Sequence, residues 1–187
     1  MNMSPTSKVV NFEVYLLMTM KIRMGSEKEA KLLQAKLGEY GLSLPDAERI
    51  YETVAKALDG EASRFENMKK LLGITDTACA TVGYTSILWP DFDFKATADK
   101  DGRLESARYW HARGHFPNVD SPAELPTWST DVTEFAAHFG PMTNGDRRPL
   151  FDKVLPAHEG YEFLWNGERY GAEFSWGLFL YSAEFWE

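Results

Sequence analysis

"YEFLWNGERYGAEF", residues 161–174, carries the strongest structural signal in this chain of 187 residues. The pair Asn166-Gly167 separates two segments in which apolar and polar residues alternate. Both central residues of a type I′ turn need positive φ, which Asn and Gly tolerate, so the pair predicts a two-residue β-hairpin. The register that follows pairs Trp165 with Glu168, Phe163 with Tyr170, and Tyr161 with Ala172.

This register divides the side chains of the hairpin between two faces. One face is aromatic and is predicted to lie in the core: Tyr161, Phe163, Trp165, Tyr170 and Phe174. The other face is mostly charged: Glu162, Leu164, Arg169 and Glu173. A third strand is expected from residue 176 to residue 186.

The chain between Gly73 and the hairpin also has the character of strands and loops. Period-two patterns predict strands at 80–89, 92–98 and 103–111, with a turn at 99–102. Residues 114–126 and 140–149 are expected to be loops, and Thr130 or Asp131 is expected to cap a short helix that ends at Phe139.

The first 73 residues favour helices after an initial strand. Every even-numbered position from Val10 to Met24 is apolar, which predicts a strand with one buried face. Ser26 and Glu29 form a capping box that opens a helix to Leu37. Further helices are predicted after Ser43, with proline in the first turn, and over 61–72, where Gly73 ends the helix.

The sequence therefore predicts an α+β fold, with an N-terminal strand and three helices followed by a mostly antiparallel β-sheet with hairpins. We expect one domain over residues 1–187, made of a helical segment (26–73) and a β-rich acidic segment (76–187). The N-terminal strand is expected to join the same sheet.

Charge is distributed unevenly between the two parts of the chain. Residues 1–75 hold 11 Lys and Arg against 10 Asp and Glu, a net charge of +1, whereas residues 76–187 hold 9 against 18, a net charge of −9. An acidic surface repels nucleic acids and anionic membranes and attracts basic surfaces. Solubility alone also accounts for an acidic excess, and this alternative stays open at this point.

Motifs for known chemistries are absent from the sequence. There is no glycine-rich nucleotide motif, no nucleophile elbow and no zinc-protease motif. His111 and His115 are four residues apart but lie at a strand end and in a loop, and His138 and His158 follow at no characteristic spacing, so we expect no metal site and no cofactor. The single cysteine, Cys79, and the lack of a secretory signal favour the cytoplasm.

We expect a non-enzymatic acidic binding protein that inhibits a basic, nucleic-acid-handling protein or ribonucleoprotein by covering its nucleic-acid site. Toxin-immunity proteins and anti-defence inhibitors of phages and mobile elements, such as anti-CRISPR proteins, work in this way, and the analogy is one of function alone. The predicted contact residues are Asp91, Asp93, Glu162 and Glu173. Direct binding to nucleic acid or to a membrane is not expected. The alternative is a small metal-assisted or acid/base enzyme that uses His and carboxylate side chains.

Overall fold

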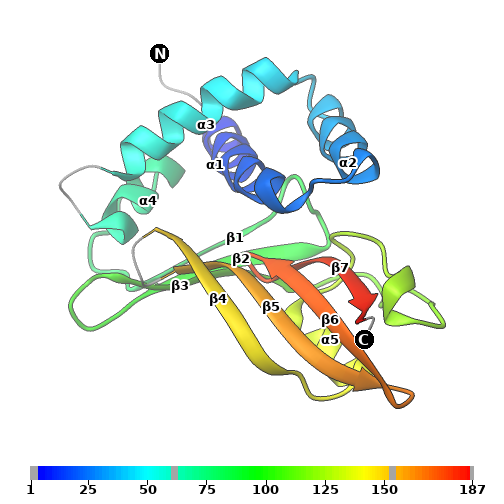
Figure 1. Cartoon of the computed structure of the whole chain (residues 1–187). Coiled ribbons are helices and arrows are strands. Elements are labelled where there is room, and N and C mark those ends of the chain that lie inside the picture. The colour runs from blue at the N-terminus through cyan, green and yellow to red at the C-terminus, as the bar shows by residue number, and fades with distance from the viewer. Residues whose placement is uncertain (1–3, 60–62, 152–154, 186–187) are drawn as a thin grey trace. The chain divides into compact units, whose positions relative to one another are not determined.

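The computed structural model describes residues 4–59, 63–151 and 155–185, and it has an α+β fold (Figure 1). The helices are α1 (Pro5–Met20), η1 (Lys21–Arg23), α2 (Glu27–Gly38), α3 (Leu44–Leu58), α4 (Arg64–Leu72), η2 (Pro122–Glu124) and α5 (Val132–Phe139). The strands are β1 (Thr81–Thr85), β2 (Phe92–Ala98), β3 (Leu104–His111), β4 (Thr143–Phe151), β5 (Leu155–Trp165), β6 (Glu168–Ser175) and β7 (Leu178–Glu184). They form two antiparallel sheets, ordered β1-β2-β3 and β4-β5-β6-β7, where one sheet was predicted.

The chain divides into two compact units. The first contains residues 1–82, 86–88 and 96–105, and the second contains residues 83–85, 89–95 and 106–187. The first unit therefore holds helices α1 to α4, and the second holds α5 and the four-stranded sheet. The expectation of a single domain stays a prediction.

The predicted N-terminal strand is wrong, because the segment forms helix α1. Every side chain from Phe12 to Met20 is buried, including Glu13 and Thr19. From Phe12 onwards the helix is buried on all sides and has no polar face, so this part need not show a period of 3.6 residues, and the alternation at even positions was accidental. Ser4 caps the helix by accepting a hydrogen bond from the Ser7 amide.

The three following helices match their predicted signals. Ser26 with Glu29 and Ser43 with Asp46 both form capping boxes at the starts of α2 and α3. Helix α4 begins at Arg64, after the cap Ser63, and ends at Gly73, which adopts the left-handed conformation with φ of 75°. The predicted start of this helix at residue 61 lies outside the described residues.

Glu13 connects α1 to the segment that follows β1. Its buried carboxylate accepts hydrogen bonds from the Ser86 hydroxyl (2.6 Å) and from the backbone amides of Ile87 and Leu88 (2.9 Å each). Three donors compensate the loss of water around the buried carboxylate. These contacts also explain why β1 ends at Thr85, although the sequence predicted a strand to residue 89.

The hairpin in the second unit has the predicted register. Trp165 lies opposite Glu168, Phe163 opposite Tyr170 and Tyr161 opposite Ala172. Asn166 and Gly167 both have positive φ, 51° and 86°, as a type I′ turn requires.

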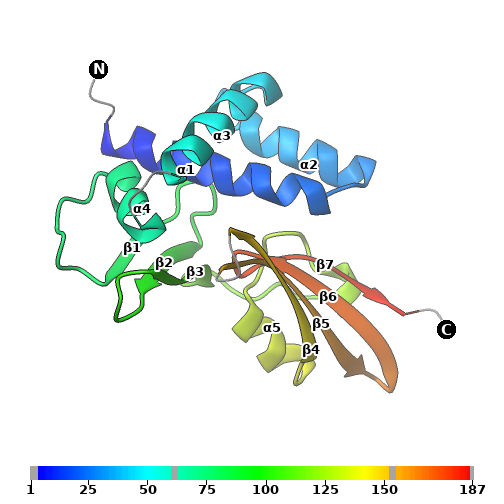
Figure 2. The same ribbon diagram turned by 60° about the vertical axis from the view of Figure 1, so that its left-hand side comes forward.

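The aromatic face of the hairpin packs against α5. Figure 2 shows this helix on one face of the four-stranded sheet. Asp131 caps α5, as predicted, and the Phe135 ring meets Phe163 edge to face and Phe179 in a stacked arrangement. The buried members of this core are Leu125, Phe135, Phe139, Phe163, Ala172, Phe174 and Phe179.

Two features of the second unit differ from the sequence prediction. Residues 140–149 were predicted to be a loop, but residues 143–151 form the edge strand β4. The predicted strand from 176 to 186 is shorter, because Trp176 and Gly177, with φ of 52° and 81°, form a second tight turn between β6 and β7. Glycine is required at 177, since an added Cβ would lie 2.9 Å from the backbone oxygen of Tyr109.

We predict that Glu13→Gln lowers the free energy of unfolding by roughly 2 kcal/mol or more. The NH₂ group of glutamine would face the buried hydrogen-bond donors that now bind the carboxylate, so a donor loses its acceptor. An unsatisfied buried donor costs about 1–3 kcal/mol. Urea denaturation measures the effect. The matched control is Glu52→Gln on the exposed surface of α3, which should change stability by less than about 0.5 kcal/mol. Equal stability of the two variants would contradict this role of Glu13.

We also predict that Gly177→Ala destabilises the protein more than Gly167→Ala. Both substitutions force alanine into positive φ, at a cost of about 1–2 kcal/mol. An added Cβ at 167 meets nothing within 4 Å, whereas at 177 it overlaps the backbone of β3, which adds roughly 1–3 kcal/mol. Thermal or urea unfolding of the two variants gives the comparison, and an equal loss at both sites would show that the close approach to Tyr109 is unimportant.

Candidate interaction surface

The four predicted contact residues lie in the second unit, on two different sheets. Asp91 and Asp93 flank Phe92 at the start of β2, and Asp91 is exposed. Glu162 on β5 and Glu173 on β6 belong to the four-stranded sheet, on the face opposite the aromatic core. The alternation predicted from the sequence therefore holds, since Phe92, Phe163 and Phe174 are buried.

The carboxylate of Asp93 has a basic partner within the chain. Arg113 donates a hydrogen bond to Asp93 Oδ1 (2.6 Å), and also binds the backbone oxygens of Pro90 and Phe92. The hydrogen bond from Arg113 is the main reason why the pKa of Asp93 is lowered, and it raises the pKa of Arg113. Asp91 adds a smaller electrostatic contribution to that rise.

The two glutamates are paired as well. Glu162 Oε2 accepts hydrogen bonds from Arg169 (2.6 Å to its terminal nitrogen and 3.2 Å to Nε), and Glu173 pairs with the buried ring of His158. Each pair runs along a diagonal between β5 and β6, and the residue directly opposite each glutamate is a glycine, Gly171 or Gly160. A missing side chain at 160 makes room for the Glu173 carboxylate, which lies over that glycine.

These pairs change how the predicted acidic surface is understood. Replacing Glu173 would remove the partner of the buried His158, so its effect is not confined to the surface. The hairpin register placed Glu162 and Arg169 on one face as diagonal neighbours, so that pair could have been found from the sequence. The Asp93 pair joins residues 20 positions apart, and no local pattern indicates it.

The face of the four-stranded sheet that lies opposite α5 also exposes large apolar side chains. We call it the outer face, and its exposed apolar residues are Leu164 (69% exposed), Tyr181 (41%) and Phe185 (46%). The Phe185 ring lies over Gly171 and receives the guanidinium of Arg169 at 5.3 Å from its centroid. Exposed apolar groups beside ion pairs are typical of protein contact surfaces.

A shallow hollow of about 310 Å³ lies on this outer face. Its walls come from β4, β5, β6 and the segment before β4: Pro141, Thr143, Glu162, Phe163, Leu164 and Arg169. The hollow therefore combines an exposed leucine with an ion pair, and it contains one of the four predicted contact residues.

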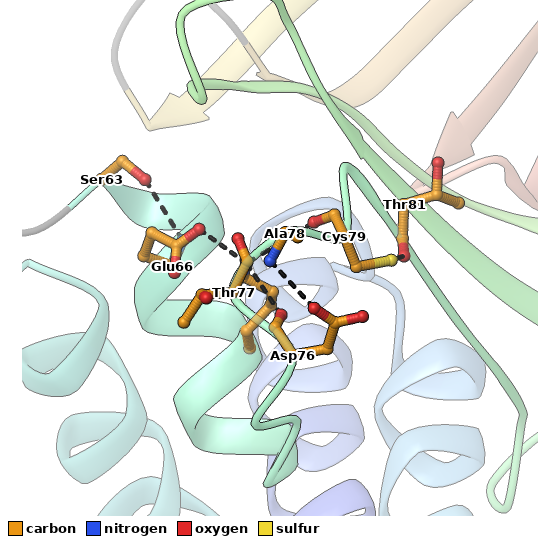
Figure 3. A network of polar contacts seen from close by, with 8 residues as sticks. Ser63, Glu66, Asp76, Thr77, Ala78, Cys79 and Thr81 are labelled. Carbon is orange, nitrogen blue, oxygen red and sulfur yellow. Dashed lines mark hydrogen bonds and ion pairs between the residues drawn. The ribbon is translucent and has the colours of Figure 1, made fainter.

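A second polar cluster, in the first unit, is centred on the buried side chain of Lys69. Its ammonium group binds Glu66 (2.7 Å) and donates to the backbone oxygens of Asp76 (3.3 Å) and Thr77 (3.3 Å). Figure 3 shows Glu66 of α4 beside the loop that carries Asp76 and Thr77. The backbone oxygen of Cys79 also lies within reach, at 3.5 Å, and we interpret the cluster as an anchor for residues 74–80.

The histidines predicted for the alternative, enzymatic reading do not form a common site. His111 Nδ1 lies 2.7 Å from Glu134 Oε2, His158 pairs with Glu173, and the ring of His138 stacks on Phe116 at 3.6 Å. His115 is exposed. Among the residues that the structure describes, no three His, Cys, Asp or Glu side chains are placed to hold a metal ion. Glu134 Oε2, which contacts His111, also accepts a hydrogen bond from the Thr130 hydroxyl.

Comparisons of the chain with protein-family models, curated proteins and solved structures found no match. None of the described helices has the length and apolar character needed to cross a membrane. The candidate site is a sheet face that carries paired charges and exposed apolar residues.

We predict that the Asp93 carboxyl titrates below its ordinary pKa, and that Arg113→Gln returns the titration towards the ordinary value. A depressed pKa means that ionised Asp93 stabilises the fold above its ordinary pKa, and that this contribution is lost as the pH falls through the depressed pKa. NMR titration of the side-chain carboxyl carbon measures both values. An unchanged midpoint in the Arg113 variant would contradict the assigned cause.

Proposed function

We propose that this chain is a non-enzymatic binding protein that inhibits a basic, nucleic-acid-handling protein or ribonucleoprotein by covering its nucleic-acid site. The observation that carries the proposal is the net charge of −9 over residues 76–187, against +1 over residues 1–75. Charge of one sign gathered in one part of the chain attracts a partner of the opposite sign and speeds the encounter.

The geometry of the second unit supports binding in a particular way. An interface needs apolar groups that lose water on contact, and the outer face supplies Leu164, Tyr181 and Phe185. The ion pair of Glu162 with Arg169 holds both long side chains in place before binding, which lowers the entropic cost of association.

The acidic excess therefore acts over a distance, and the outer face makes the contact. Three of the four predicted acids already have basic partners, so the attraction comes from the summed charge of the second half rather than from a row of unpaired carboxylates. This division of roles fits a toxin-immunity protein or an anti-defence inhibitor acting in the cytoplasm, without a cofactor.

The enzymatic alternative lacks an observation of comparable weight. Its histidines are dispersed among separate contacts in the part of the chain that the structure describes. His111 also stacks on Phe92 with a ring separation of 4.9 Å, which gives it a packing role.

The proposal predicts that the purified chain captures a basic nucleic-acid-binding protein from a lysate of its host, and that raising the salt concentration weakens capture. Neutral isosteres at the four predicted residues (Asp91→Asn, Asp93→Asn, Glu162→Gln, Glu173→Gln) should slow association by roughly tenfold, because they reduce the summed negative charge that steers the encounter. Surface plasmon resonance with the captured protein measures the rates.

The matched control removes four exposed acids from the helical part (Glu27→Gln, Glu39→Gln, Glu48→Gln, Glu52→Gln). Three of these are also paired, with Lys31, Lys36 and Lys21 respectively, so the control matches both the net charge and the loss of ion pairs. If both variants slow association equally, the acidic excess acts as a general property, such as solubility, and not through this surface. Capture of no basic protein by the unmodified chain would overturn the proposal.

A further inference from the structure

The hollow on the outer face is lined by Glu162, and one oxygen of its carboxylate accepts no hydrogen bond from the described residues. Arg169 donates through two nitrogens to the same atom, Glu162 Oε2, at 2.6 and 3.2 Å. Oε1 of that carboxylate receives no hydrogen bond in the part of the chain that the structure describes, and the side chain is one-third exposed (33%). A carboxylate accepts through two oxygens, so Glu162, which lines the hollow, keeps acceptor capacity for a ligand.

Arg169 holds this carboxylate in place without filling the hollow. The guanidinium is fixed on one side by Glu162 and on the other by the Phe185 ring, at 5.3 Å from its centroid. Gly171 permits this arrangement, since an added Cβ there would lie 3.0 Å from the ring of Phe185. The acceptor is thus preorganised, and a ligand that binds it need not order a mobile glutamate.

The wall beside this acceptor is apolar. Leu164 lies directly opposite Arg169 and is 69% exposed, the most exposed of the large apolar residues on the outer face. A ligand that fits must therefore present a cation to Glu162 and an apolar surface to Leu164. A lysine or arginine side chain with an apolar neighbour meets both needs, because its own aliphatic stem also packs on apolar walls.

We propose that this hollow seats a cationic side chain from a loop of the protein partner, next to an apolar side chain that covers Leu164. The inference rests on the proposed function and names the contact that the basic partner makes. Charge complementarity selects a cation, because the Glu162 carboxylate keeps acceptor capacity beside the exposed Leu164. A volume of about 310 Å³ holds one or two side chains, which fits a loop and not a folded surface.

The test measures binding of the captured partner to Leu164→Ser and Glu162→Gln by isothermal titration calorimetry. Each variant should raise the Kd by about tenfold or more, as substitutions at the centre of an interface do. The controls are Leu32→Ser, at an exposed leucine on α2, and Glu105→Gln, at an exposed glutamate on β3, and neither should change the Kd more than about twofold. Circular dichroism verifies that all four variants keep the fold.

A photo-crosslinking amino acid placed at 164 identifies the occupant directly, with the same residue at 32 as the control. Crosslinking of a basic protein from 164 alone, at a segment with Lys or Arg beside an apolar residue, supports the proposal. Crosslinking only to a second copy of this chain would overturn the proposed contact in the hollow. An unchanged Kd for Leu164→Ser, together with slower binding of the four-isostere variant, would also overturn this contact. Both outcomes leave the proposed function in place. If the unmodified chain captures no basic protein, both proposals fail.

Discussion

The two-residue turn at Asn166-Gly167 determines what the second unit presents to its surroundings. Side chains alternate along a strand, so a shift of one residue in the register would exchange the aromatic face for the charged one. Phe163 and Phe174 enter the core beneath α5 because of this register, and Glu162 and Leu164 reach the outer face for the same reason. The core and the candidate interaction surface are therefore two results of one constraint.

The outer face shows how formal charge and available charge differ. Glu162 and Glu173 count as two negative charges in the sequence, yet each is paired diagonally across β5 and β6 with a basic residue. The more exposed of the two pairs, Glu162 with Arg169, is of a kind that contributes little to stability, typically below about 1 kcal/mol. The larger effect of both pairs here is to hold side chains in one orientation, which converts a mobile charged surface into one with a defined shape.

Local signals predicted most of the fold, and the failures have physical causes. Caps at Ser26, Ser43 and Asp131, and the turn at Asn166-Gly167, depend on residues close in sequence, so they could be predicted. Helix α1 was missed because complete burial removes the polar face from which a helical period is recognised. The candidate site was predicted in part: the register gave the outer face of the hairpin, whereas the pair of Asp93 with Arg113 depends on tertiary contacts.

The carboxylate of Glu13 lies near the start of the chain and binds residues that are synthesised much later. Leu88, which donates to it, lies 75 positions further along. At a translation rate of about 5–20 residues per second, Leu88 is synthesised roughly 4 to 15 s after Glu13. During that interval helix α1 cannot be buried without enclosing an uncompensated charge, so the apolar segment around Phe12 and Leu16 remains open on the nascent chain. The first unit thus completes its folding only after the segment that follows β1 has left the ribosome.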